Sequence, residues 1–303
     1  MLRSCHYHVA RPFVAGVVIC LTVGGLVLLA QQAPSRPAPT QAATPPVAPR
    51  TAADDGYTDT PMLPGLPWHV HDPARPHPAI VTPGATPGAA PSDALVLFDG
   101  RDLSKWTQYG TGADSNKLLD PKWVVRDGYF ETGARTGAVY TRESFGDVQL
   151  HVEWASPDLI VGNSQGRGNS GIKMMGLYEI QVLDSYNNKT YADGQAGAIY
   201  GQWPPLANVA RKSGEWQTYD IVFEAPRFEN DKMVKPAFLT VIWNGVVVHN
   251  RKEVMGKTLH RDVGKYSPPY ATELPLMLQD HNNPVRYRNI WVRRLATYDQ
   301  PEK

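Results

Sequence analysis

Apolar and polar residues alternate with a period of two over the last two-thirds of the chain, from Ala94 onward. Such alternation predicts strands that bury one face and expose the other, and no stretch keeps the 3.6-residue spacing of an amphipathic helix. Asp127-Gly128 and Asn244-Gly245 interrupt the pattern, and both dipeptides are typical of tight hairpins. Strands are therefore expected at 95–98, 123–125, 129–131, 148–154, 178–183, 219–223, 238–248, 276–278 and 285–292.

Short strands joined by Gly, Pro and Asn turns indicate one all-β domain over residues 94–296. The expected architecture is a two-sheet antiparallel β-sandwich or jelly roll, for which about 200 residues are sufficient. Residues 297–303 are expected to form a short tail.

The N-terminus has the composition of an export signal. Arg3 and Arg11 precede an uncharged, mostly apolar run over residues 13–30. This order predicts that residues 1–30 are a secretory signal peptide. The run is also long enough for a short spanning helix, so an uncleaved membrane anchor is the alternative. Both interpretations place the remainder outside the cytoplasm, in the periplasm or at the cell surface.

Proline dominates the next part of the chain, where 15 of the 27 prolines lie within residues 34–91. Residues 31–55 are rich in Pro and Ala and predict an extended linker, because proline fixes φ and removes a hydrogen-bond donor. Residues 56–93 also contain apolar side chains such as Trp68 and Ile80. We expect this second segment to pack along the following domain.

Within that segment, His69, His71 and Asp72 lie close enough in sequence to converge on one metal ion, with His77 following. The stronger interpretation is an extended segment in which His69 and His71 merely share a face.

Overall charge and cysteine content exclude several classes of function. Lys and Arg number 30 against 29 Asp and Glu, so the formal net charge is +1. A nucleic-acid partner is not expected, because such proteins usually carry a basic excess. Cys5 and Cys20 are the only cysteines, so the domain has no disulfide, thiolate nucleophile or Cys-ligated metal.

The polar faces of the expected strands carry groups suited to a sugar. Carboxylates and amides pair with hydroxyls, and aromatic rings cover the apolar faces of a sugar ring. The candidates are Glu153, Asn169, Ser170, Glu179, Gln181, Tyr200, Trp203, Gln279, His281 and Arg288. A solvated sheet face would also show polar residues at these positions, so alternation alone leaves both interpretations open.

His281 ends an apolar strand next to Asp280. A carboxylate beside it could orient the imidazole and make it an acid or base. An Asx-turn with an exposed histidine accounts for the same residues.

Several short motifs occur in a fixed order along the domain. They are Leu97-Phe98-Asp99-Gly100 with Leu103-Ser104-Lys105-Trp106, Asn169-Ser170-Gly171-Ile172, Tyr178-Glu179-Ile180-Gln181-Val182-Leu183-Asp184, Gly197-Ala198-Ile199-Tyr200, Asn244-Gly245, Leu278-Gln279-Asp280-His281 and Arg288-Asn289-Ile290. In this order they resemble the 3-keto-disaccharide hydrolase domain family, and the resemblance covers essentially all of residues 94–296.

The resemblance implies a concanavalin A-like, laminin-G-like sandwich with its site on a concave sheet. It also implies cleavage of glycosides first oxidised at C3, by abstraction of the C2 proton, elimination of the aglycone and hydration. By the same resemblance, Glu179 and His281 are the acid and base in either order, with Asp184 and Asp280 as orienting partners.

The remaining expected roles are hypotheses based on side-chain chemistry. Donors to the keto oxygen and ring hydroxyls are Asn169, Gln181 and Arg288, while Glu153, Gln279 and Asp280 bind substrate and Tyr200 and Trp203 form the sugar platform. A divalent ion among Glu179, Asp184 and His281 is conceivable, although their spacing is not diagnostic of a metal site.

Two other functions fit the same residues. One is a non-catalytic carbohydrate-binding sandwich, since fold alone does not give function. The other is an ordinary glycosidase, which needs two carboxyl groups about 5–5.5 Å or 6.5–9.5 Å apart. A carbohydrate is the expected partner in every case.

Overall fold

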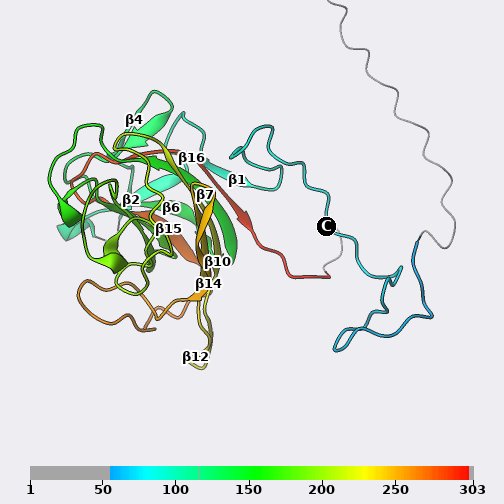
Figure 1. The fold of residues 1–303 in the computed structure, drawn as a ribbon. Coiled ribbons are helices and arrows are strands. Elements are labelled where there is room, and N and C mark those ends of the chain that lie inside the picture. The colour runs from blue at the N-terminus through cyan, green and yellow to red at the C-terminus, as the bar shows by residue number, and fades with distance from the viewer. Residues whose placement is uncertain (1–54, 116, 300–303) are drawn as a thin grey trace, which may run out of the picture. The chain divides into compact units, whose positions relative to one another are not determined.

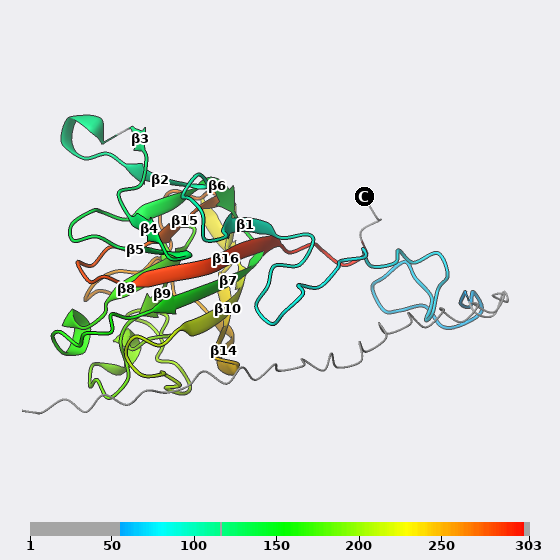
Figure 2. The ribbon, with the colours of Figure 1, turned by 90° about the horizontal axis from the view of Figure 1, so that it is seen from above.

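The computed structural model describes residues 55–115 and 117–299, which form two facing antiparallel sheets (Figures 1 and 2). The helical pieces in the described part of the chain are 3-10 turns at Gly112–Asp114, Ser164–Gly166 and Ala192–Gly194. The prediction of an all-β sandwich is confirmed.

The larger sheet has eight strands, and every pairing in it is antiparallel. In spatial order they are β14 (Val246–Glu253), β13 (Phe238–Trp243), β10 (Gln217–Glu224), β7 (Val148–Ala155), β16 (Arg286–Arg294), β5 (Tyr129–Glu131) and β4 (Val124–Arg126), with β1 (Leu95–Phe98) also paired to β16. β7 and β16 run side by side through its centre (Figure 2).

The smaller sheet has six strands. In order they are β3 (Leu118–Leu119), β2 (Trp106–Tyr109), β6 (Val139–Phe145), β15 (Leu274–Leu278), β8 (Ser170–Met174) and β9 (Tyr178–Val182). A separate hairpin is formed by β11 (Arg227–Glu229) and β12 (Lys232–Lys235).

Aromatic side chains fill the space between the two sheets. The ring of Tyr178 on β9 lies 5.7 Å from that of Phe223 on β10, and Trp106 lies 5.9 Å from Phe130. Tyr287 donates a hydrogen bond of 2.7 Å to the hydroxyl of Ser170 across the same interior. Ser170 thus faces the core, and its expected place on a sugar-facing surface is wrong.

Strand alternation decides which side chains reach which surface. On β7, Leu150, Val152 and Trp154 are buried in the core, so His151 and Glu153 lie on the outer face of the larger sheet. A shift of one residue would exchange these sets, which is why the apolar pattern holds the register firmly.

Residues 84–92 lie over that outer face, because the carbonyl of Gly88 accepts hydrogen bonds from Asn289 (2.8 Å) and Trp291 (2.9 Å). His151 stacks on Trp291 with ring centroids 5.3 Å apart, and its Nδ1 lies 2.7 Å from Asp220. Burial disfavours the charged imidazole, but interactions with Asp220 and Glu153 prevail and raise the pKa of His151 to about 9.

The predictions for residues 1–54 fall outside the described residues. Of the segment over residues 56–93, the part around Gly88 packs on the domain, whereas Ile80 is 94% exposed. No helix in the described ranges is long and apolar enough to span a membrane.

The His151 cluster predicts that stability falls in alkaline solution. The folded pKa of about 9 exceeds the unfolded value of about 6.5, so this stabilisation is complete below pH 6.5 and is lost as the pH rises through 9. We expect the free energy of unfolding to fall by about 3 kcal/mol across that window. Denaturant titrations of wild type and His151→Gln across this pH range measure the change in the free energy of unfolding. The same pH dependence in both proteins would contradict the raised pKa of His151.

His249 provides a matched control for this experiment. It is equally buried, but burial lowers its pKa to about 4 despite a hydrogen bond to the carbonyl of Gly197. His249→Gln should therefore leave the slope between pH 6.5 and 9 unchanged.

Candidate functional site

Three adjacent strands of the smaller sheet present polar groups on the face turned away from the core. Since Ile172, Ile180 and Leu278 point inward, the intervening positions of β8, β9 and β15 point outward. Lys173 and Glu179 are directly opposite each other in the β8–β9 hairpin. This outward surface is called the site face below.

Glu179 is the most unusual group on the site face. Its exposed fraction is only 4%, and its Oε2 lies 3.1 Å from the ammonium nitrogen of Lys173. Burial raises the pKa of Glu179, and the opposing charges of Lys173 and His281 do not cancel that effect. The carboxylate is therefore more basic than an ordinary glutamate.

Gly171 provides the space that Glu179 occupies. A Cβ at residue 171 would come within 2.4 Å of Glu179 Oε1 and 3.0 Å of its carboxyl carbon. The carboxyl group thus lies across the backbone of β8, toward β15.

Amide side chains form a second group beside Glu179. Gln165 accepts from the amide of Gln181 at 3.0 Å and donates to the carbonyl of Gly194 at 2.8 Å. Asn169 donates to the backbone carbonyl of Gln165 at 2.7 Å. The Oε1 atom of Gln181 is buried without a hydrogen-bond partner, which is costly unless a ligand supplies a donor.

A cavity of about 580 Å³ is lined by Tyr191, Asp193, Tyr200 and residues 260–263, and Tyr200 connects it to Glu179. The backbone nitrogen of Tyr200 donates to the carbonyl of Glu179 at 3.1 Å. The side-chain hydroxyl of Tyr200 lies 2.8 Å from the Tyr191 hydroxyl and 3.2 Å from Nδ1 of His260. The volume falls within the ~300–1,000 Å³ range of small-molecule sites.

Tyr200 is a neutral hydroxyl on this cavity. Burial, the hydrogen bond to Tyr191 and the negative charges of Glu179 and Asp193 all raise its pKa. It can therefore donate a hydrogen bond to a sugar oxygen at neutral pH.

The structure brings together part of the predicted set. Glu179, Gln181, Asn169 and Tyr200 are linked by the contacts above, and Gln279 joins them because its backbone nitrogen bonds Gly171. His281, which follows β15, is exposed and close enough for its charge to act on Glu179.

Glu153 and Arg288 do not belong to this group. Both lie on the outer face of the larger sheet, where Arg288 Nε is 2.7 Å from Glu153 Oε2 and its guanidinium covers Trp216. The expectation that they share a surface with Glu179 is wrong, because the whole core separates the two outer faces.

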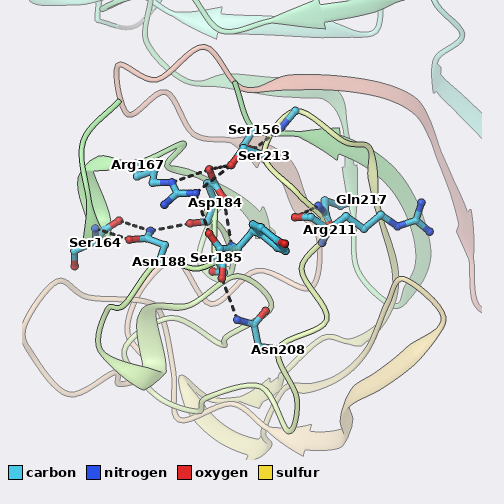
Figure 3. Close-up of polar contacts among 12 residues, drawn as sticks. Ser156, Ser164, Arg167, Asp184, Ser185, Asn188, Asn208, Arg211, Ser213 and Gln217 are labelled. Atoms are coloured by element: carbon cyan, nitrogen blue, oxygen red, sulfur yellow. Dashed lines mark hydrogen bonds and ion pairs between the residues drawn. The ribbon is translucent and has the colours of Figure 1, made fainter. Parts of the chain in front are cut away.

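Asp184, just after the end of β9, is engaged in a buried polar network (Figure 3). Its Oδ2 accepts from Arg167 at 2.8 Å and from Ser213 at 2.6 Å, and its Oδ1 accepts from the backbone of Tyr186. The network ties the end of β9 to the loops around it. Asp184 therefore does not orient Glu179 or His281.

Asp280 and Trp203 also have other contacts. Asp280 accepts from the backbone nitrogens of Gly137 (2.8 Å) and Asn282 (2.7 Å), so it stabilises turns rather than orienting His281. Trp203 donates to the carbonyl of Glu253, and Lys252 lies 3.3 Å over its ring. Trp203 is therefore not a free platform for a sugar.

No group of three or more His, Cys, Asp or Glu in the described part of the chain is placed to hold a metal ion. Asp184, one of the residues considered for a metal, is paired with Arg167 at 2.8 Å. In the N-terminal segment, Asp72 instead accepts from the backbone nitrogens of His69 and Ala74.

Several residues of the site were not identified from the sequence. Lys173 could have been identified, because in a hairpin that turns at residues 175–177 position 173 pairs with position 179. Gln165, Tyr191 and His260 come from separate loops, and no local pattern signals their convergence.

A family model for the 3-keto-alpha-glucoside-1,2-lyase-like domain matches residues 93–293. A solved structure described as a "putative glycosyl hydrolase" from Parabacteroides distasonis ATCC 8503 is 42% identical, covering 77% of this chain and all of its own, with a TM-score of 0.68. No curated protein matches the sequence.

Two further structures with the same description and organism are more distant. One is 19% identical with a TM-score of 0.47, covering 67% of this chain and 94% of its own. The other is 20% identical with a TM-score of 0.45, covering 67% of this chain and 99% of its own.

The contact between Gly171 and Glu179 predicts strong coupling between these positions. Gly171→Ala should destabilise the fold by about 1–3 kcal/mol, because the added methyl group overlaps the glutamate. In a Glu179→Ala background the same change should cost less than about 0.5 kcal/mol, since alanine leaves the space empty. Denaturant unfolding of the four proteins measures the coupling, and equal costs in both backgrounds would disprove the contact.

Proposed function

Because this chain belongs to the 3-keto-alpha-glucoside-1,2-lyase-like domain family, we propose that it cleaves glycosides whose sugar carries a ketone at C3. The observation that carries the proposal is the buried carboxylate of Glu179, paired with Lys173 and bonded through its backbone to Tyr200, which lines the larger cavity. The 42% identical structure supports a glycoside substrate, and the word lyase in the family description fits an elimination.

The chemistry requires a base, an acid and a donor to an oxyanion. A ketone at C3 acidifies the C2 proton, so a base can remove it and leave an enolate. The enolate then forms the C1–C2 double bond as the C1–O bond breaks and the leaving oxygen takes a proton. Addition of water, with hydroxyl to C1 and a proton to C2, gives net hydrolysis.

Glu179 is the base in this scheme. Its burial makes the carboxylate a stronger base than an exposed one, while the ion pair with Lys173 favours the ionised form that a base needs. Its position across Gly171 directs it away from the core.

Lys173 and Tyr200 are the donors to the enolate and to ring hydroxyls. Lys173 is half-buried, and its ammonium group has three hydrogens, so hydrogens remain after the ion pair with Glu179. A fixed cation at this position stabilises the negative charge that develops on the C3 oxygen.

His281 is the acid for the leaving oxygen. It follows β15, its charge acts on the carboxyl group of Glu179, and it is exposed to solvent that can reprotonate it. The buried carboxylate of Glu179 can accept the C2 proton, and the exposed imidazole of His281 can donate a proton to the leaving oxygen.

A chromogenic assay tests the proposal. The full chain should release phenol from an aryl 3-keto-glucoside and leave the unoxidised aryl glucoside intact. Cleavage of both would favour an ordinary glycosidase that uses a pair of carboxylates. Cleavage of neither by folded protein would overturn the proposal and favour a binding module.

In the same assay, Glu179→Gln should lower kcat/KM by about 10²–10⁴-fold, because the amide cannot accept the C2 proton. Glu153→Gln and Arg288→Gln are matched controls on the opposite outer face and should stay within about threefold of wild type. A loss below tenfold in a folded Glu179→Gln variant would remove Glu179 from the role of base.

The pH profile tests the ion pair separately. Lys173 lowers the pKa of Glu179, so Lys173→Met should raise that pKa and move the acid limb of kcat/KM to higher pH. Lys173→Arg keeps the charge and should leave the limb close to its original position. An acid limb that does not move in Lys173→Met would contradict Glu179 as the titrating base.

A further inference from the structure

The loop between β7 and β8 presents three consecutive apolar side chains to solvent. Leu159, Ile160 and Val161 have exposed fractions of 75%, 55% and 66%. They border a second cavity of about 280 Å³, together with Pro157 and Pro284. Exposed apolar residues that surround a cavity mark a binding surface more often than a random patch does.

The loop that carries His281 borders this second cavity. Asn282 and Asn283 line the cavity, and the side-chain amide of Asn283 donates to the carbonyl of His281 at 2.8 Å. Gly166, which also lines it, follows Gln165, whose side chain bonds Gly194 next to Asp193 of the first cavity. Gln165 therefore connects the loops that border the two cavities.

An unpartnered polar atom lies in the amide cluster of Gln165 and Gln181. Gln181 is only 1% exposed, and its Oε1 has no hydrogen-bond partner. A ligand hydroxyl that reaches the cluster would supply the missing donor.

The polar groups of the second cavity are largely engaged by the protein itself. Arg167 and Asp184 pair with each other, and the side-chain amide of Asn283 donates to the carbonyl of His281. A sugar needs partners for several hydroxyls, whereas the cavity offers mainly apolar walls.

We propose that the second cavity is the leaving-group subsite and that it takes an apolar aglycone of about one ring, such as a phenol. This inference rests on the proposed function, with the oxidised sugar in the first cavity and the C1–O bond beside His281. A volume of about 280 Å³ lies just below the range for drug-sized ligands, which suits a single ring.

The test compares two substrates that share the same 3-keto-glucosyl group. One has a nitrophenyl leaving group and the other has glucose. In the triple variant Leu159→Ser/Ile160→Ser/Val161→Ser, kcat/KM for the aryl substrate should fall about tenfold or more, mainly through KM. The disaccharide should stay within about twofold of wild type. Each substrate is compared with itself, so intrinsic leaving ability cancels.

Leu206→Ser is the matched control, because Leu206 is 76% exposed and lines neither cavity. It should change neither substrate. An equal loss for both substrates in the triple variant, or no loss for either, would overturn the leaving-group assignment while the proposed function stands.

If wild type cleaves neither substrate, the proposed function fails and binding decides the subsite. Calorimetry with nitrophenol should then show binding to wild type and to Leu206→Ser, and at least a tenfold weaker affinity for the triple variant. Equal affinity in all three proteins, or no binding to any, would overturn the subsite as well.

Discussion

The burial of one carboxylate constrains the rest of the site face. Glu179 lies almost entirely out of solvent, and a charge in that position needs a compensating cation within a few ångströms. The β8–β9 hairpin supplies Lys173 directly across the ladder, and Gly171 leaves room for the carboxyl group on the neighbouring strand. The register of the hairpin, the ion pair with Lys173 and the absence of a side chain at Gly171 therefore depend on one another. A change in any of them would alter the basicity of Glu179.

The core of the sandwich separates the Glu179–Lys173 pair from a second polar cluster. His151, Asp220, Glu153 and Arg288 form a charged group on the outer face of the larger sheet, partly covered by the backbone at Gly88. Facing sheets lie about 10 Å apart across a packed core, so neither cluster can reach the other. One outer face adjoins the larger cavity, while the other has a segment of the chain packed over it. Residues with similar side-chain chemistry, such as Glu153 and Glu179, therefore lie in different surroundings on the two outer faces.

Loops between the strands supply the side chains that line the two cavities. The sheet holds Lys173 and Glu179 rigidly, whereas Tyr191, His260 and the apolar residues 159–161 come from connections whose ends the strands fix. A rigid sheet with variable loops is a common way to keep chemistry constant while the bound molecule changes. On the site face, the strands carry the charged pair and the loops carry the walls of both cavities. The buried Arg167–Asp184 pair anchors the loops at one end of this surface.

The sequence by itself determined strands such as β7, because alternation of Leu150, Val152 and Trp154 with polar neighbours is a local property that burial of one face enforces. β2 and β6 were not among the strands expected from the sequence. It also determined that Glu179 and Gln181 share a face, and the ordered motifs identified the family. Only the tertiary structure decided which sheet each polar face belongs to. Glu153 and Glu179 alternate in the same way along their strands, yet they lie on opposite sides of the core. Alternation gives the side of a strand but not the sheet or the neighbour, since those depend on pairings and loop contacts between residues far apart in the chain.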